Sequence, residues 1–155
     1  MIISDSTTII TLLNIDKLEI LHNLFDVVYL PQRVYNEIVI DEKIELDRSF
    51  FIIKEIKDRR LYSILLKALD SGEAEAIILA MEMNLSLIID ERKGRKVAKN
   101  LGINIFGFIG LLLLNHKNGY LSESGTIDVF NKAKEQGFRV GQRLESDFLR
   151  KIYEN

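Results

Sequence analysis

The sequence predicts an α/β fold, a three-layer α/β/α sandwich around a central, mainly parallel sheet of about five strands. Five short runs rich in β-branched or aromatic residues are the candidate strands: 1–4, 27–30, 50–53, 85–89 and 103–106. Between them, apolar residues recur at spacings of three and four, as expected of helices that connect parallel strands. The 155 residues, 47% of them hydrophobic and none of them Cys, are enough to bury a core without disulfides.

The first two strands each lead into a helix. Strand 1–4 runs into four small polar residues, 5–8, which disfavour a longer strand and can cap a helix. The apolar spacing that follows predicts two short helices meeting around residues 14–16. The second strand is followed by Pro31, which fits a first helical position and predicts a helix up to about Ile40.

The rest of the chain continues the alternation of strands and helices. After a charged loop, 41–48, strand 50–53 is expected at an edge of the sheet. Further helices are predicted over 61–69, 73–83, 93–101, 108–117, 122–136 and 142–153. We expect a single domain, 1–155, in which the helices of about 122–153 complete the core or form a surface for a partner.

Charge is unevenly distributed along the chain. The formal total of −2 combines −8 through Glu91, from 17 acidic and 9 basic residues, with +6 from Arg92 onward, from 6 acidic and 12 basic residues. A near-neutral total therefore does not exclude a nucleic-acid partner. The absence of Cys excludes thiol chemistry and fits a reducing compartment, so a cytoplasmic location is expected. No apolar run has the length of a membrane span, and no membrane association is expected.

Carboxylates stand where predicted strands end and helices begin. Asp5 and Asp90 each follow a strand, and they emerge at the same sheet edge if those strands are parallel neighbours. Glu37 and Glu73 lie near the starts of helices. Like charges at short range raise one another's pKa unless a cation neutralises them, and carboxylate oxygens suit Mg²⁺ or Mn²⁺. The pattern indicates metal-assisted hydrolysis of a phosphodiester.

Each of these acidic residues also has a structural explanation. Asp5 and Asp90 can cap the helices that follow them. Glu37 can be a solvated surface residue, and Asp70 with Glu73 fits a capping box. Spacing alone leaves these alternatives open.

A basic helix is predicted directly after Asp90 and Glu91. Its residues Arg92, Lys93 and Lys96 can neutralise phosphates next to the acidic site. The alternative is a solvated helix that packs through Val97 and Leu101.

Four segments together resemble the PIN-domain family. They are Ser4-Asp5-Ser6, Leu30–Ile38, Asp70–Ile77 with its Gly-Glu-Ala-Glu-Ala string, and Leu87–Gly94 with its Asp-Glu-Arg-Lys-Gly string. Within this family, the sequence is most similar to a prokaryotic VapC-like branch. The resemblance implies a five-stranded parallel sheet, Mg²⁺ or Mn²⁺ bound by clustered acids, and cleavage of single-stranded RNA, in many members by the toxin of a toxin–antitoxin pair.

The same resemblance assigns roles residue by residue. The acids that match the family's catalytic metal ligands are Asp5, Glu37, Glu73 and Asp90, and Ser6 matches a small hydroxyl residue that supports them. Glu73 stands where many PIN nucleases have Asp, and Glu75 is a second candidate there. On a helix Glu73 and Glu75 point about 200° apart, so at most one of them faces the site, and Glu73 is preferred. Glu75 and Glu91 are kept as reserve ligands.

The preferred function is that of a metal-dependent endoribonuclease. The resemblance to the PIN family implies a small antitoxin protein and a second copy of the chain as partners. The alternative is a catalytically weak or inactive PIN-like module that binds nucleic acid or protein. A third candidate is a hydrolase of small phosphate compounds that uses the same metals.

Overall fold

The structure, a computed structural model, describes residues 1–154 and divides into two compact units. Unit 1 comprises Met1–Ile9 and Phe25–Gly107, and unit 2 comprises residues 10–24 and those from Phe108 onward. The first helix, α1 (Ser6–Asn14), begins in unit 1 and ends in unit 2.

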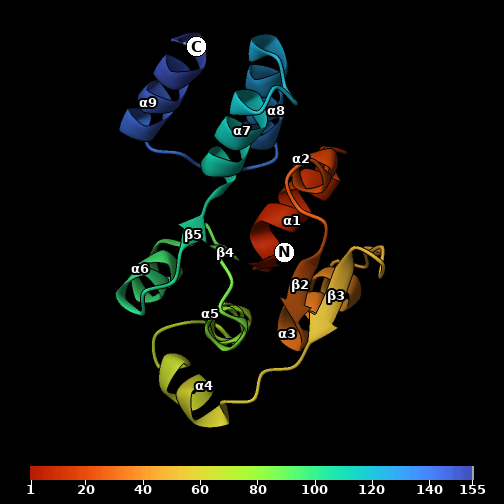
Figure 1. Ribbon diagram of the computed structural model, residues 1–155, viewed down its shortest axis with the longest axis vertical. Helices are drawn as coiled ribbons and strands as arrows, with labels where there is room; N and C mark the ends of the chain where they lie inside the picture. Colours follow the sequence, from red (N-terminus) through yellow and green to blue (C-terminus); the bar gives the residue numbers. More distant parts are fainter. Residues whose placement is uncertain (155) are drawn as a thin grey trace. The chain divides into compact units, whose positions relative to one another are not determined.

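Unit 1 contains a sheet of five parallel strands in the order β3-β2-β1-β4-β5 (Figure 1). The strands are β1 (Ile2–Ser4), β2 (Val28–Pro31), β3 (Phe51–Lys54), β4 (Leu87–Ile88) and β5 (Ile105–Phe106). Ile3 in the central strand is in register with Tyr29 on one side and Leu87 on the other. The predicted α/β class is confirmed, as are the five strands and the edge position of the third strand.

Helices flank this sheet, and α5 (Ser71–Met83) is the most deeply buried of them. It packs against β1, β2 and β4, and against α3 (Gln32–Asn36) and α6 (Arg92–Asn100). All its residues from Gly72 to Ala80 are buried. A helix enclosed on all sides accommodates small side chains where neighbours approach closely, which accounts for the alanines at 74, 76 and 80.

Two helices of unit 1 differ from their predicted form. The helix expected over 31–40 is α-helical only through α3 and continues as a π-helical turn, η1 (Glu37–Asp41), in which Glu42 N–H donates to the Glu37 carbonyl at 3.1 Å. Apolar spacing does not distinguish an α-helical turn from one that holds an extra residue. Helix α4 (Arg59–Leu65) starts before the predicted residue 61 because the Asp58 carboxylate caps it, accepting from Leu61 N–H at 2.9 Å.

Unit 2 is helical and contains α2 (Glu19–His22), α7 (Phe108–Lys117), α8 (Glu123–Glu135) and α9 (Gln142–Tyr153). Helices α7, α8 and α9 pack against one another, and the buried rings of Phe130 and Phe148 lie 4.7 Å apart between centroids. Leu144 and Tyr153 on α9 stay 50% and 60% exposed. The C-terminal helices therefore build a core within unit 2 and also present apolar side chains at the surface, while the single-domain organisation stays a prediction. No helix among residues 1–154 is long and apolar enough to cross a membrane.

Asn115 is a buried polar residue in the middle of this helical unit. Its amide nitrogen donates to the carbonyls of Ile20 at 3.0 Å and Leu111 at 2.9 Å, and its side-chain oxygen accepts from Asn23 at 2.9 Å. We expect Asn115→Ala to lower the free energy of unfolding by about 2–3 kcal/mol, because it leaves buried polar groups without partners. Urea denaturation measures this, and Asn131→Ala on exposed α8 surface is the control; equal effects of the two variants would contradict the role assigned to Asn115.

Candidate active site

The carboxyl ends of β1 and β4 meet where the strand order reverses direction. The chain builds the sheet outward from β1 to β2 and β3 on one side, and from β4 to β5 on the other, so the β1–β4 edge is the topological switch point. Asp5 follows β1, and its N–H donates to the Ile88 carbonyl at 2.9 Å. Asp90 follows β4 on the neighbouring parallel strand. The prediction that Asp5 and Asp90 emerge at one edge is confirmed.

Asp5 is only 6% exposed, although it carries a carboxyl group. The pKa of the Asp5 carboxyl is raised from 3.8 to about 7, chiefly by burial and also by the charges of Glu37, Asp70 and Glu91, while a hydrogen bond from the Ser6 backbone acts in the opposite direction. An acid in this environment is strongly favoured to take up a proton or a cation.

Glu73 at the start of α5 is also buried and forms the predicted capping box with Asp70. Glu73 N–H donates to Asp70 Oδ1 at 2.8 Å, and Asp70 N–H donates to Glu73 Oε1 at 3.4 Å. The capping box uses only Oε1 of Glu73. The other oxygen, Oε2, is buried and has no hydrogen-bond partner within residues 1–154. Burial first, and then the hydrogen bond and charge of Asp70 and the charge of Asp5, raise the pKa of Glu73 from 4.5 to about 8.

The position of Glu73 Oε2 depends on a glycine in α6. A Cβ atom at Gly94 would lie 2.7 Å from Glu73 Oε2 and 2.6 Å from Ile89 Cδ1. Only glycine lets α6 approach the carboxylate this closely without displacing it.

Glu37 reaches the same group of acids from the β2 side. Its Oε2 accepts a hydrogen bond from Ser6 Oγ at 2.6 Å. Burial raises the pKa of Glu37; the Ser6 hydrogen bond and the positive charge of Arg33 lower it, and the charges of Asp70 and Asp41 raise it. Glu37 is therefore no isolated surface residue, because Ser6 binds its carboxylate.

Asp70 is an acid that sequence reasoning assigned only to the capping box. Its charge raises the pKa of each of Asp5, Glu37 and Glu73. We therefore define the acid cluster as Asp5, Glu37, Asp70 and Glu73. The sequence could have indicated that Asp70 belongs to this cluster, because Asp70 stands directly before the helix that carries Glu73.

Asp90 is held by a residue that the sequence did not single out. Thr8 Oγ1, buried on α1, donates to Asp90 Oδ2 at 2.6 Å. Thr8 lies close to one helical turn after Asp5, a spacing that could have indicated a shared side. The N-cap of α6 is Glu91, which is exposed and makes no capping hydrogen bond with its side chain, so the alternative in which Asp90 caps this helix is wrong.

Glu75 is buried but is bound by residues outside the acid cluster. Its Oε1 accepts from Arg33 N–H at 3.1 Å, and its Oε2 pairs with Arg59 Nη1 at 3.2 Å. Glu75 therefore ties α3 and α4 to α5. Glu73 lies two residues earlier and points from a different face of the helix. It is Glu73 whose pKa the charge of Asp5 raises.

The acids do not form a completed metal site. Among residues 1–154, no group of three or more His, Asp or Glu side chains is arranged to hold a metal ion. Glu37 and Asp90 instead accept from Ser6 and Thr8. The chemistry of the donor set nevertheless fits Mg²⁺ or Mn²⁺, because the donors are carboxylate oxygens and Glu73 Oε2 is buried with no hydrogen bond from the described part of the chain. Ligation by the four predicted acids stays a prediction.

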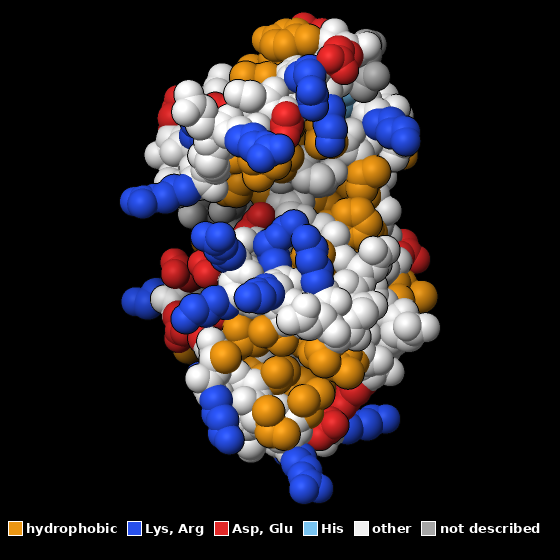
Figure 2. All heavy atoms as spheres, turned by 90° about the vertical axis from the view of Figure 1, so that its left-hand side faces the viewer, with side chains coloured by type: hydrophobic (Ala, Val, Ile, Leu, Met, Phe, Trp, Pro, Cys, Tyr) orange, Lys and Arg blue, Asp and Glu red, His pale blue; other side chains and the backbone are white. Residues whose placement is uncertain are grey.

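Helix α6 presents basic residues beside this edge. Figure 2 shows lysine and arginine side chains gathered over the part of unit 1 that α6 occupies. Arg92, Lys93 and Lys96 are exposed. The helix packs through Gly94 and Ala98, which are buried; Val97 is half-buried, and Leu101 is 39% exposed.

The fold is that of an α/β protein with a parallel sheet. Buried acids lie at the switch point of this sheet and a basic helix flanks them, which makes this edge a candidate site for phosphate substrates. The family model DUF3368, a PIN domain, matches residues 1–154, and the chain belongs to this family. PIN domains are typically nucleases and generally use divalent metals. No curated protein matches the chain. The resemblance to the PIN family is thus confirmed, and the VapC-like branch is not established by this match.

Proposed function

We propose that this protein is a divalent-metal-dependent endoribonuclease that hydrolyses phosphodiester bonds of single-stranded RNA. The observation that carries the proposal is the buried Glu73 Oε2 atom, which has no hydrogen-bond partner in the described chain and lies in a cluster with buried Asp5. Burial raises the pKa of both Asp5 and Glu73, and the charge of Asp5 raises that of Glu73 further, so the two acids are costly to ionise unless a cation accompanies them. Membership of the PIN family supports a nuclease with such a cation.

The proposed metal ligands are Asp5, Glu37, Glu73 and Asp90, with Glu91 in reserve, since Glu75 is bound by Arg33 and Arg59. Mg²⁺ or Mn²⁺ held by these acids would supply a nucleophilic water at neutral pH and would stabilise negative charge on the phosphate. The hydroxyls of Ser6 and Thr8 orient two of the acids by donating to their carboxylates.

The exposed cations of α6 would hold the RNA backbone. Arg92, Lys93 and Lys96 follow the end of β4 directly and carry positive charge next to the acids. Each phosphate that they neutralise makes RNA affinity more dependent on salt.

The test is cleavage of three substrates by the purified protein. We expect single-stranded RNA to be cut internally with Mn²⁺ or Mg²⁺ and to stay intact with EDTA, because the acids need a cation to act. A chromogenic phosphodiester and a phosphomonoester are assayed in parallel. Faster turnover of the phosphomonoester than of RNA would favour the small-phosphate hydrolase, and no metal-dependent cleavage of RNA would contradict the proposal.

The second candidate is a PIN-like module that binds nucleic acid or protein without cleavage. The observation that favours it is that no three acids in residues 1–154 are arranged as metal ligands. Isothermal titration with Mn²⁺ separates the two candidates. A catalytic cluster binds the metal and loses this binding in Asp90→Asn, whereas a binding module shows no heat of metal binding in either protein.

We further propose that the protein is a toxin with a small antitoxin partner, and that it acts as a homodimer in the cytoplasm. The resemblance to the VapC-like branch supports this. Induced expression of the chain in bacteria should then slow growth, and expression of Asp5→Asn should not. Equal growth with both proteins would contradict the toxin role.

A further inference from the structure

Arg95 is the cation of α6 that is held in place next to the acids. Unlike its exposed neighbours Arg92 and Lys96 it is half-buried, and its Nη1 donates to the Ile89 carbonyl at 2.9 Å. Ile89 immediately precedes Asp90, so the guanidinium group lies at the carboxyl end of β4. One N–H of the group makes this bond, and a guanidinium group carries four further N–H donors.

Gly107 leaves the space that Arg95 and Asp90 need. A Cβ atom at this position, just after β5, would lie 2.6 Å from Arg95 Nη1 and 2.8 Å from Asp90 Oδ1. The guanidinium and the carboxylate therefore lie next to the same point of the backbone. Since Thr8 binds Oδ2 of Asp90, Arg95 lies on the Oδ1 side of this acid.

Arg33 is a second anchored arginine, on the opposite side of the acid cluster. It lies in the first turn of α3, directly after β2, and its Nε donates to Ser71 Oγ at 3.1 Å. Ser71 opens α5 immediately after Asp70. The anchored guanidinium of Arg33 thus stands next to Glu37 at the start of η1 and the acids at the start of α5.

The strand order places the two arginines on either side of Asp5. Arg33 follows β2, Asp5 follows β1, and Arg95 is bonded at the end of β4 beside β5. Strands lie about 4.8 Å apart, so two to three strand spacings, on the order of 10–15 Å, separate the two groups along the edge. The acids between them repel a polyanion, and a cation on each side offsets that repulsion.

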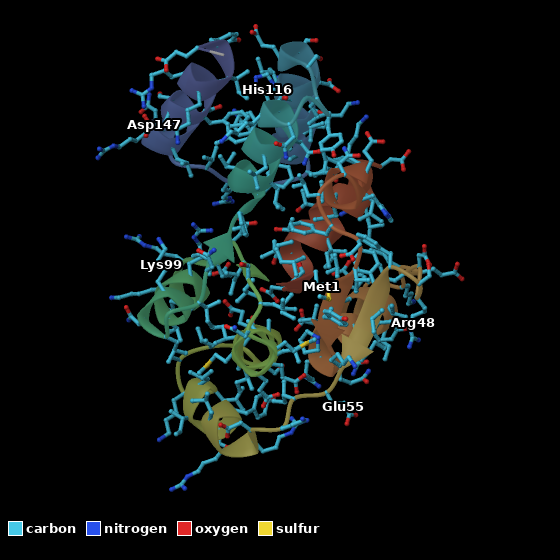
Figure 3. The ribbon with its side chains drawn as sticks, viewed as in Figure 1. Met1, Arg48, Glu55, Lys99, His116 and Asp147 are labelled. Carbon is cyan, nitrogen blue, oxygen red and sulfur yellow. The ribbon has the colours of Figure 1, made fainter. Side chains whose placement is uncertain are left out.

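We propose that Arg33 and Arg95 bind the phosphates on either side of the bond to be cut, so that the RNA strand crosses the carboxyl edge of the sheet from the β2 side to the β5 side. This inference rests on the proposed function and names the path of its substrate. A planar guanidinium with one N–H already bonded is oriented before RNA arrives, so it loses less entropy on binding a phosphate than a mobile lysine does. Lys99, by contrast, extends from α6 away from the sheet (Figure 3).

The test measures binding of a fluorescein-labelled ten-nucleotide oligouridylate by anisotropy, with Ca²⁺ in place of Mn²⁺. We expect Arg33→Gln and Arg95→Gln each to weaken binding about tenfold and the double variant about a hundredfold, because sites this far apart act independently. Lys99→Gln is the matched control, with a change of less than about twofold. Arg95→Lys should retain part of the affinity, since it keeps the charge but loses the anchored fork.

Cleavage kinetics with Mn²⁺ provide the second readout. The Gln variants should lower kcat/KM by about the same factor as they lower affinity, with unchanged melting temperatures. The proposed path is contradicted if either Gln variant binds within about twofold of wild type, or if wild type binds no RNA. Arginine-dependent binding without any cleavage would overturn the nuclease proposal alone, and cleavage by wild type with unaffected Gln variants would overturn the path alone. Where a Gln variant does not fold, the corresponding Lys variant decides by the same criterion.

Discussion

Asp5→Asn is expected to lower kcat/KM for Mn²⁺-dependent RNA cleavage by at least about 10²–10³-fold. Asp5 is buried at the switch point, and its charge acts on Glu73 in the acid cluster. Asn keeps the shape of the side chain but removes the negative charge and one ligating oxygen. Initial rates on a single-stranded RNA with a fluorophore and quencher measure the change.

The free energy of unfolding of Asp5→Asn shows whether its loss of activity comes from the missing carboxylate or from unfolding. Because Asn cannot ionise, we expect metal-free Asp5→Asn to be folded and, at pH 8, more stable than wild type. Asp128→Asn, on the exposed surface of α8, is the matched control and should keep full activity. An Asp5→Asn protein that cleaves RNA within about threefold of the wild-type rate would contradict both the role of Asp5 and the nuclease proposal.

The metal-free protein is expected to lose stability as the pH rises from about 5 to 8. In the folded protein the pKa of Asp5 is raised from 3.8 to about 7 and that of Glu73 from 4.5 to about 8. The native state therefore holds protons that the unfolded chain has released. Their stabilisation is fully present below the unfolded pKa values and is lost as the pH rises through the folded ones. For Asp5 alone the loss reaches up to about 4 kcal/mol.

Urea denaturation in EDTA at a series of pH values measures this loss. Asp5→Asn should show a shallower dependence on pH than wild type, because one of the acids with a raised pKa is gone. Mn²⁺ should stabilise wild type most at pH 8, where the acids are ionised and can bind it, by about 2.7 kcal/mol at a hundred times its dissociation constant. A metal-free protein that becomes more stable between pH 5 and 8 would show that the acids are not held in the buried cluster.

Most of the fold could be predicted from the sequence because its signals are local. The helix predicted over 108–117 has those bounds in the structure, and each of the five predicted strands is present. The strand predicted over 85–89 narrows to Leu87–Ile88, since pairing with both neighbours, not composition, sets its ends. The π-helical turn at Glu37 was missed because its apolar spacing is that of an α-helix.

The candidate site was predictable in outline because parallel strands bring their carboxyl ends to one edge. This rule places Asp5 and Asp90 together once β1 and β4 are neighbours. It says nothing of Thr8, which binds Asp90 across 82 positions of the chain, or of Arg33, which binds Ser71 across 38. Such partners depend on how α1 and α3 pack, and no local pattern contains that information.

Glu73 and Glu75 show where the two sources of information divide. The sequence by itself determined that these two acids stand at the start of a helix, and that at most one of them can face the site. Only the tertiary structure decided that Glu75 is bound by Arg33 and Arg59 while Glu73 keeps a buried oxygen beside Asp5. The physical reason is that helix periodicity orients the two side chains, but the neighbours that meet them come from segments far away in the chain.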